Sequence, residues 1–170
     1  LPSGHARDLG VGPAFGSLEK RVTEITVPQI RNIPVELRKS LLCFDWWILN
    51  GDRCFSENGG NPNLFWEPQK RELVVIDHNQ AFDSDVTTES FFLDHIFNDV
   101  SEEIADDLVE RQIYTEKMNK ALSRWDTIVA TLPEEWFYID PEMTIEVGLT
   151  TEQLKSHLLL YLNDDFWNWK

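Results

Sequence analysis

The part of the chain that decides the fold runs from residue 44 to residue 82 and reads FDWWILNGDRCFSENGGNPNLFWEPQKRELVVIDHNQAF. Its first residues belong to an apolar pattern with helical spacing, which predicts a helix over about 34–50. Residues 51–63 are dense in turn formers, and a connection of this length is typical of functional loops. Two apolar runs at 64–66 and 73–76 then predict a small β-hairpin.

Three polar residues border these predicted elements. Asp52 directly follows the helix, Asn63 directly precedes the first strand, and Asp77 directly follows the second. Antiparallel pairing would bring Asn63 and Asp77 to the same end of the hairpin. Phosphoryl transfer needs a carboxylate beside the attacking hydroxyl and oxygen ligands for Mg²⁺, and protein kinases place such residues in this order. The alternative is that these residues only cap turns, as Asx residues commonly do.

The spacing within the loop departs from that of protein kinases. Their catalytic loop places its Asn about five residues after the Asp, whereas Asn63 lies eleven residues after Asp52. Asn61 therefore competes with Asn63 for the metal-ligand role. We prefer Asn63, because it immediately precedes the predicted strand.

The remainder of the chain is predicted to be mostly helical, with an α+β fold overall. Helices are expected to start near Thr88 and Ser101, to span 114–132 before Pro133, and to start again at Thr150 with a capping box. We expect three or four helices after the hairpin. The aromatic residues near the end of the chain are expected either to dock onto the domain or to form a partner surface.

Residues 1–33 differ from the rest because they are rich in Gly and Pro. Their one alternating stretch, residues 22–27, predicts a short strand or an extended linker. We therefore predict two units, a linker over 1–33 and a helical unit over 34–170.

Composition and charge exclude several classes of partner. Thirty acidic and fifteen basic residues give a net charge of −15, which would repel nucleic-acid phosphates and anionic membranes. No apolar run is long enough to span a bilayer, and no signal peptide is evident. The two cysteines, Cys43 and Cys54, lack metal-site spacing, so a reduced, cytoplasmic setting is expected.

Several segments of the chain resemble the HipA-like kinases, specifically a small subgroup of them, and more distantly the phosphatidylinositol-kinase-like group. The resemblance lies in 44–53, 59–66 and 73–82, and extends to GPAFGS at 12–17, PEEW at 133–136 and DDFW at 164–167. It implies the helical C-terminal lobe of a protein-kinase-like fold, with the short hairpin at the metal site.

The resemblance also implies roles for individual residues. Asp52 would be the catalytic base, Asn63 and Asp77 the magnesium ligands, and Arg53 a supporting residue or a contact to a substrate phosphate. Asn61 and His78, beside these positions, are the expected cofactor contacts. The implied cofactors are ATP and Mg²⁺, and the implied partners are a nucleotide and a protein substrate with a Ser or Thr hydroxyl. A toxin role paired with an antitoxin is implied as well.

The histidines suggest a second interpretation of the site, a hydrolytic one, which the sequence supports less well than phosphoryl transfer. Asp77 and His78 could form a hydrolytic pair, but adjacent strand residues point to opposite faces and no recognisable nucleophile elbow accompanies them. His95 and His157 fall within predicted helices and are expected to be surface or boundary residues.

One part of the kinase pattern is missing from the sequence. A kinase needs a glycine-rich loop and a strand-borne Lys, but Gly10-x-Gly12 is too weak to serve, and Lys20 follows no suitable apolar strand. The resemblance then implies that residues 1–33 are the hinge-side end of an N-terminal lobe that is absent or supplied by another chain. The alternative function is a non-catalytic binding module, or pseudokinase, that keeps only the C-terminal lobe.

Overall fold

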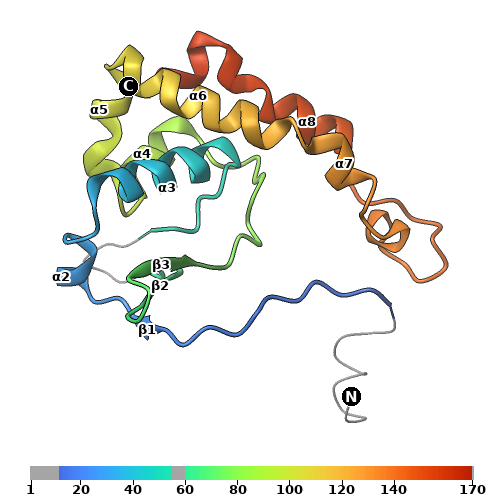
Figure 1. Ribbon diagram of the computed structural model, residues 1–170. Helices are drawn as coiled ribbons and strands as arrows, with labels where there is room; N and C mark the ends of the chain where they lie inside the picture. The colour runs from blue at the N-terminus through green and yellow to red at the C-terminus, as the bar shows by residue number, and fades with distance from the viewer. Residues whose placement is uncertain (1–11, 55–59, 170) are drawn as a thin grey trace.

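The computed structural model describes residues 12–54 and 60–169 of the chain. Figure 1 shows a body of packed helices, a small sheet beneath it, and a helical extension to one side. The mostly helical α+β fold expected from the sequence is therefore confirmed. The segment Gly10-x-Gly12 begins outside the described residues, as does part of the 51–63 loop.

Helix α3, Val35–Trp47, forms the centre of the body. Leu42, Cys43, Trp46 and Trp47 from this helix are buried in the core. The helix stops earlier than the predicted residue 50, because Leu49 adopts a left-handed backbone with a φ of 47°. This early turn directs the chain into the loop that carries Asp52.

The sheet consists of three antiparallel strands in the order β1-β2-β3. Strand β2, Leu64–Glu67, and strand β3, Glu72–Val75, form the predicted hairpin, with Leu64 opposite Val75. Strand β1, Thr23–Glu24, pairs with the other edge of β2 and fulfils the expected short strand. Helix α2, Val27–Ile30, follows it and was not expected from the sequence.

The part of the chain after the hairpin contains more helices than the three or four expected. They are α4 Thr88–Asp94, η1 Asn98–Val100, α5 Ser101–Ala105, α6 Leu108–Leu122, α7 Trp125–Val129, η2 Glu134–Phe137, α8 Thr151–Leu158, η3 Leu160–Leu162 and η4 Asp164–Trp167, where η denotes 3₁₀ turns. The capping box at Thr150 and Gln153 is present as predicted. None of the described helices is long and apolar enough to cross a bilayer.

The prediction of one helix over 114–132 was wrong, because α6 and α7 are separate. At the junction, the Ser123 hydroxyl donates a hydrogen bond of 2.7 Å to the carbonyl of Lys120. The Arg124 amide donates to Ala121, three residues back. This tightened turn ends the regular α-helical pattern.

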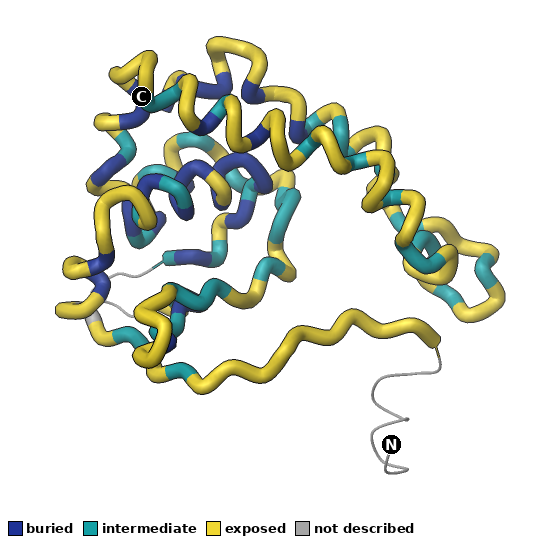
Figure 2. Tube along the Cα trace, in the orientation of Figure 1, coloured by how far each residue is buried: buried dark blue, intermediate teal, exposed yellow. Residues whose placement is uncertain are grey.

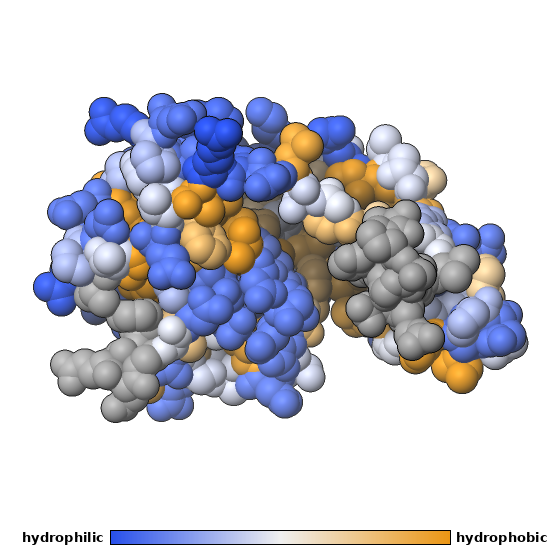
Figure 3. Space-filling model, turned by 90° about the horizontal axis from the view of Figure 1, so that it is seen from below, coloured by the Kyte–Doolittle hydropathy of each residue, from blue (hydrophilic) through white to orange (hydrophobic). Residues whose placement is uncertain are grey.

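The helical extension, which we call the arm, comprises residues 119–157. Figure 2 shows that it is half-buried or exposed throughout, whereas the body contains continuous buried stretches. Figure 3 shows that the face seen from below is hollowed between body and arm, with apolar side chains lying deep in the hollow.

The last described residues pack against α3. The Trp46 indole Nε1 donates to the carbonyl of Phe166 at 3.0 Å, and the Trp47 Nε1 donates to that of Leu158 at 2.8 Å. Trp169 stacks on Phe92 with ring centroids 4.7 Å apart. Of the two alternatives for the C-terminal aromatic residues, docking onto the domain is the one observed.

Candidate active site

Asp52, Asn63 and Asp77 gather at one end of the β2–β3 hairpin. The Asn63 side-chain amide donates a hydrogen bond of 3.0 Å to the Asp52 carboxylate. The carbonyl of Asn63 accepts a bond of 3.1 Å from the amide of Ile76, the residue before Asp77. The end of the hairpin therefore connects the loop carboxylate with the residue that follows β3.

Two of these residues have an uncommon backbone conformation. Asn63 has a φ of 51° and Asp77 a φ of 56°, both in the left-handed region. Asn and Asp tolerate this region better than most residues, although it remains uncommon for any residue other than glycine. Asn63 comes directly before β2 and Asp77 comes shortly after β3, so the backbone at these residues sets the direction in which each side chain leaves the sheet. Such backbone outliers often mark functional sites.

Arg53 holds the surroundings of the loop together from inside. Its side chain has no exposed surface and forms an ion pair with Asp45, Nε to Oδ2, at 2.6 Å. Its Nη1 donates to the carbonyls of Pro62 and Asn63 at 3.0 and 3.1 Å. Its Nη2 donates to the His78 Nε2 at 3.1 Å. One guanidinium thus joins helix α3, both sides of the loop and the segment after β3.

His95, the residue that follows helix α4, completes this buried network. Its Nδ1 accepts a hydrogen bond from the Phe97 amide at 3.1 Å, so Nε2 carries the proton and donates to Asp45 at 3.1 Å. Burial lowers the pKa of His95 below its usual value more than the Asp45 carboxylate raises it. The histidine is therefore neutral at pH 7.

Asp45 is the anion at the centre of the network. Burial alone would raise the pKa of this carboxyl group, but hydrogen bonds from His95 and Arg53 and the charge of Arg53 outweigh it, so the pKa lies below its usual value. The side chain is fully buried. An ionised carboxylate at such depth needs this full set of donors, because an unpaired buried charge is costly.

Two expectations from the sequence need correction. Arg53 was given two roles, and its enclosed guanidinium fits only the supporting role, because no part of it is exposed to meet a substrate phosphate. His95 was expected at the surface or a boundary, but its residue is 4% exposed. The reason is that the end of α4 packs across α3, where the backbone of Ile96 also donates to the Arg53 carbonyl at 3.0 Å.

A large cavity of about 1110 Å³ opens beside Asp77. One wall is formed by strand β3 and the residues after it, and the other by the extended segment before β1. The lining residues are Phe15, Ser17, Leu18, Glu19, Lys20, Val22, Phe65, Leu73, Val74, Val75, Ile76, Asp77, His78 and Asn79. The cavity is large enough for a nucleotide-sized ligand and is mainly apolar, with polar groups at the Asp77 end.

The remaining predicted site residues lie close to this arrangement. His78 lines the cavity and accepts from Arg53, and burial together with the Arg53 charge lowers its pKa. The Asn61 side-chain oxygen accepts a bond of 3.1 Å from the Asn63 amide, so it already has a partner. Residues 55–59, part of the same loop, lie outside the described residues.

The oxygen atoms of this site suit a magnesium ion. The Asn63 side chain donates through its nitrogen to Asp52, which leaves its Oδ1 without a hydrogen-bond partner in the described part of the chain. Asp77 is exposed at the cavity. Mg²⁺ commonly binds one or two protein oxygen ligands and completes its shell with phosphates and water. Within the described ranges, no group of three or more His, Cys, Asp or Glu forms a metal cluster.

Sequence reasoning missed three residues near this site. Asp45 and His95 meet only through tertiary packing, fifty residues apart, and neither carries a local motif. Lys20 was not given a nucleotide role, but it lines the cavity and lies 3.7 Å from the Glu67 carboxylate. The only available signal for Lys20 was a pair of basic residues, Lys20 and Arg21, directly before a predicted strand in an acidic chain.

Comparison with known proteins gives one match. A family model described as HipA-like kinase matches residues 1–170. No curated protein and no solved structure matches the chain.

Proposed function

Because the chain belongs to the HipA-like kinase family, we propose that it transfers the γ-phosphate of ATP, with Mg²⁺, to the hydroxyl group of a protein Ser or Thr. The observation that carries this proposal is the chain of hydrogen bonds at one end of the hairpin. It joins Asp52 to Asn63, and Asn63 to the backbone of Ile76, the residue before Asp77. A base and two oxygen ligands in this order are what phosphoryl transfer requires.

Asp52 is the residue proposed to act on the acceptor. It is half-buried, lies in the loop that follows helix α3, and receives a hydrogen bond from Asn63. One carboxylate oxygen is held by that bond, which leaves the other to orient the acceptor hydroxyl and take its proton. The buried Arg53 fixes the backbone on both sides of this position, so the carboxylate is held in place before the substrate arrives.

Asn63 and Asp77 are proposed to hold the metal ion. When bound, Mg²⁺ would neutralise charge on the phosphates of the nucleotide. The left-handed backbone at both residues supports this assignment, because each turn brings an oxygen-bearing side chain to the end of the hairpin. With a net charge of −15, a phosphate-bearing ligand must be met by a metal ion or by a local basic patch.

The cavity beside Asp77 is proposed to bind the nucleotide. Its mainly apolar walls, including Phe15, Leu18 and Leu73, suit a base, and its Asp77 end suits the metal-bound phosphates. Lys20 lies in the same lining and is the cationic side chain there. We propose Lys20 as a further contact for the anionic part of the nucleotide.

A second candidate is a non-catalytic binding module. The described residues contain one three-stranded sheet, and none of its strands carries the Lys of a kinase N-terminal lobe, which is the observation in favour of this candidate. Such a module would keep the fold and use it as a binding surface, but it would transfer no phosphate. Pairing of a toxin with an antitoxin remains a prediction from the family resemblance.

Titration calorimetry and radiolabel transfer separate these functions. The intact chain is titrated with ATP in the presence and absence of Mg²⁺, and transfer from γ-labelled ATP is followed to the chain itself and to a mixed Ser/Thr peptide library. Asp77→Asn should abolish the Mg²⁺-dependent part of ATP binding. Asp52→Ala should retain that binding but lower transfer by about 10²-fold or more.

Asp94→Asn is the matched control, because Asp94 is an exposed carboxylate of helix α4. This variant should behave as wild type in both assays. Transfer that survives both Asp52→Ala and Asp77→Asn would overturn the kinase assignment. Absence of ATP binding by the intact chain would support the non-catalytic module.

A further inference from the structure

We propose that a second cavity, formed between the end of α2, helix α3 and the segment after α4, binds an organic oxyanion, meaning a phosphate monoester or a carboxylate that carries an apolar group. The cavity has a volume of about 510 Å³ and is lined by Ile30, Arg31, Arg38, Ile96, Phe97, Asn98 and Asp99. It shares no lining residue with the cavity at Asp77. The proposal does not depend on the kinase activity.

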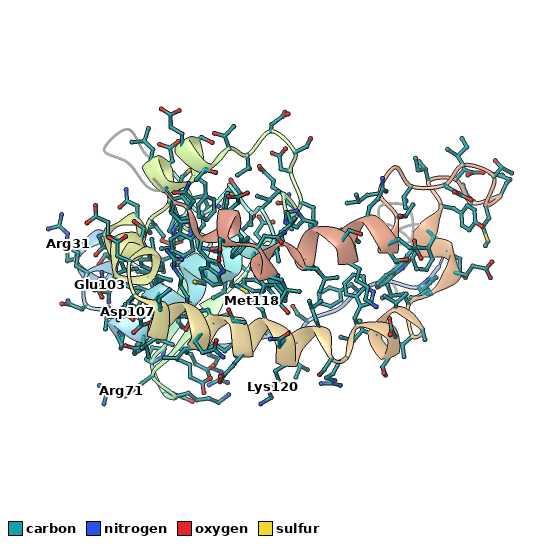
Figure 4. All side chains as sticks on the ribbon, turned by 90° about the horizontal axis from the view of Figure 1, so that it is seen from above. Arg31, Arg71, Glu103, Asp107, Met118 and Lys120 are labelled. Atoms are coloured by element: carbon teal, nitrogen blue, oxygen red, sulfur yellow. The ribbon has the colours of Figure 1, made fainter. Side chains whose placement is uncertain are left out.

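Two arginines from different elements line this cavity. Arg31 follows the end of α2, and Arg38 lies in α3. Figure 4 shows Arg31 at the end of the molecule opposite the arm. Only fifteen of the 170 residues are basic, against thirty acidic ones. Two guanidinium groups in one small cavity therefore form a local positive site on an otherwise acidic protein, and guanidinium groups are well suited to binding carboxylates and phosphates.

One hydrogen-bond donor of the Arg38 guanidinium has no partner among the described residues. Its Nη1 forms an ion pair with Asp99. Its Nε is buried and has no hydrogen-bond partner among the described residues. Buried polar atoms without a partner are rare in native proteins and call for an explanation such as a bound ion or ligand. A guanidinium can bind an oxyanion through two parallel hydrogen bonds, and Nε is one of the nitrogens that can take part.

Asp99 can be exchanged for a ligand at little cost. Its side chain is 57% exposed, and an ion pair with such an exposed partner contributes little to stability. Arg31 forms no ion pair with any other described residue. An incoming oxyanion would therefore displace one solvated carboxylate from Arg38 and gain the Arg31 charge as well.

Apolar groups form the rest of the lining and select the kind of anion. Ile30 and Phe97 are buried residues of the core that border the cavity, and Ile96 lies beside them. Inorganic anions would leave the accessible part of this lining, such as the half-buried Ile96, uncovered. A ligand that joins an oxyanion to an aromatic or aliphatic group would cover it and gain from the removal of apolar area from water.

Nuclear magnetic resonance titration of the intact chain tests the proposal. The probes are phenyl phosphate and phenylacetate, which separate the phosphate from the carboxylate source, and phenol, which lacks the anion. We expect phenyl phosphate or phenylacetate to shift the amide signals of Ile96, Phe97 and Asn98, and phenol to leave them unchanged. Binding should weaken as salt is raised.

Variants locate the site and distinguish it from the nucleotide cavity. Arg31→Gln should weaken binding about tenfold, as expected for the loss of a hydrogen bond to a charged group. Asp99→Asn should strengthen binding, because it removes the competing carboxylate. Arg71→Gln, at the exposed turn between β2 and β3, is the matched control and should have no effect. Asp77→Asn should also leave binding intact.

The proposal is overturned if neither anion shifts these amides, or if Arg31→Gln and Asp99→Asn leave the affinity unchanged. Equal binding of phenol and phenyl phosphate would also contradict it, since the guanidinium groups would then play no part. Loss of binding in Asp77→Asn would assign the probe to the other cavity. Because Arg31 is exposed and Asp99 largely exposed, neither test depends on a variant with a disturbed core.

Discussion

At the scale of single residues, the guanidinium of Arg53 connects helix α3, the loop after it and the segment after β3 by hydrogen bonds. Asp45, Pro62, Asn63 and His78 all receive hydrogen bonds from it. Two of these bonds are made to backbone carbonyls, so a shorter or less branched side chain could not replace them. The geometry of Asp52 and Asn63 thus depends on a residue that itself touches no solvent.

Arg53→Gln should therefore destabilise the protein severely. The change leaves Asp45 as a buried carboxylate without its ion-pair partner, and we expect a loss of about 3–5 kcal/mol in the free energy of unfolding. Urea denaturation followed by Trp fluorescence measures this quantity. Arg71→Gln is the surface control and should stay within about 0.5 kcal/mol of wild type. A loss for Arg53→Gln no larger than that of the control would contradict the assigned role.

The neutral state of His95 makes stability depend on pH. Its pKa is lowered in the folded protein from the ordinary 6.5, so the unfolded chain binds the proton more readily. The free energy of unfolding should consequently fall as the pH is lowered below about 6.5, with a slope of at most about 1.4 kcal/mol per pH unit from this group. The lowered pKa of Asp45 adds a further loss only under more acidic conditions, below its ordinary 3.8.

Urea denaturation at a series of pH values between 7.5 and 5, chosen to bracket this range, tests the role of His95. In His95→Gln the dependence on pH should be shallower than in wild type. His78 and His157 also have pKa values lowered by burial and should supply the slope that remains. An unchanged slope in the variant would show that His95 is not the group responsible.

At the scale of elements, local sequence signals were enough to predict some helices and strands but not others. The β2–β3 hairpin and the start of α8 were predictable, because short apolar runs and a capping box act over a few residues. Helix α2 and the break between α6 and α7 were not. In α2 only four residues are helical, and its place is set by Ile30 and Ile33 packing into the core.

The same contrast applies to the candidate site. Asn63 and Asp77 could be predicted because they lie at the ends of a hairpin that is visible in the sequence, and Asp52 because it lies in the turn-rich loop before that hairpin. The supporting network could not be predicted, because Asp45 lies in α3, His95 directly follows α4, and only tertiary packing brings them together. The cavity wall formed by residues 15–22 also arises from tertiary structure, since that segment has little regular structure of its own.

Helix α8 provides a test at this scale. The Thr150 hydroxyl accepts from the Gln153 amide at 3.2 Å, and the Gln153 side chain accepts from the Thr150 amide at 2.8 Å. Thr150→Ala should lower the free energy of unfolding by about 1 kcal/mol, the usual cost of losing an N-cap. Thr150→Ser keeps the hydroxyl and should recover most of the loss in chemical denaturation. Equal stability of the Ala and Ser variants would contradict a capping role.

At the scale of the whole molecule, the body and the arm differ in how they are stabilised. Core residues concentrate around α3, whereas none of residues 119–157 is buried. Regions with few buried apolar contacts open locally at a low free-energy cost. The arm should accordingly be the less stable part of the described structure, although it is helical for much of its length.

Hydrogen exchange followed by mass spectrometry can measure this difference. Amides of α7 and η2 should exchange much faster than those of α3, and the start of α6 should resemble the body. Peptides covering 35–47 serve as the internal reference for slow exchange. Comparable protection in the arm and in α3 would show that the arm is stabilised by contacts beyond those described.

The indole bonds of Trp46 and Trp47 have a consequence for synthesis on the ribosome. Their partners, Leu158 and Phe166, come 111 and 120 residues later in the chain. At ordinary translation rates, each partner residue is synthesised on the order of ten seconds after its tryptophan. During that interval α3 carries two uncovered tryptophans in the nascent chain, which is a surface that chaperones recognise. The core around α3 can therefore close only after residues 158–166 have left the exit tunnel.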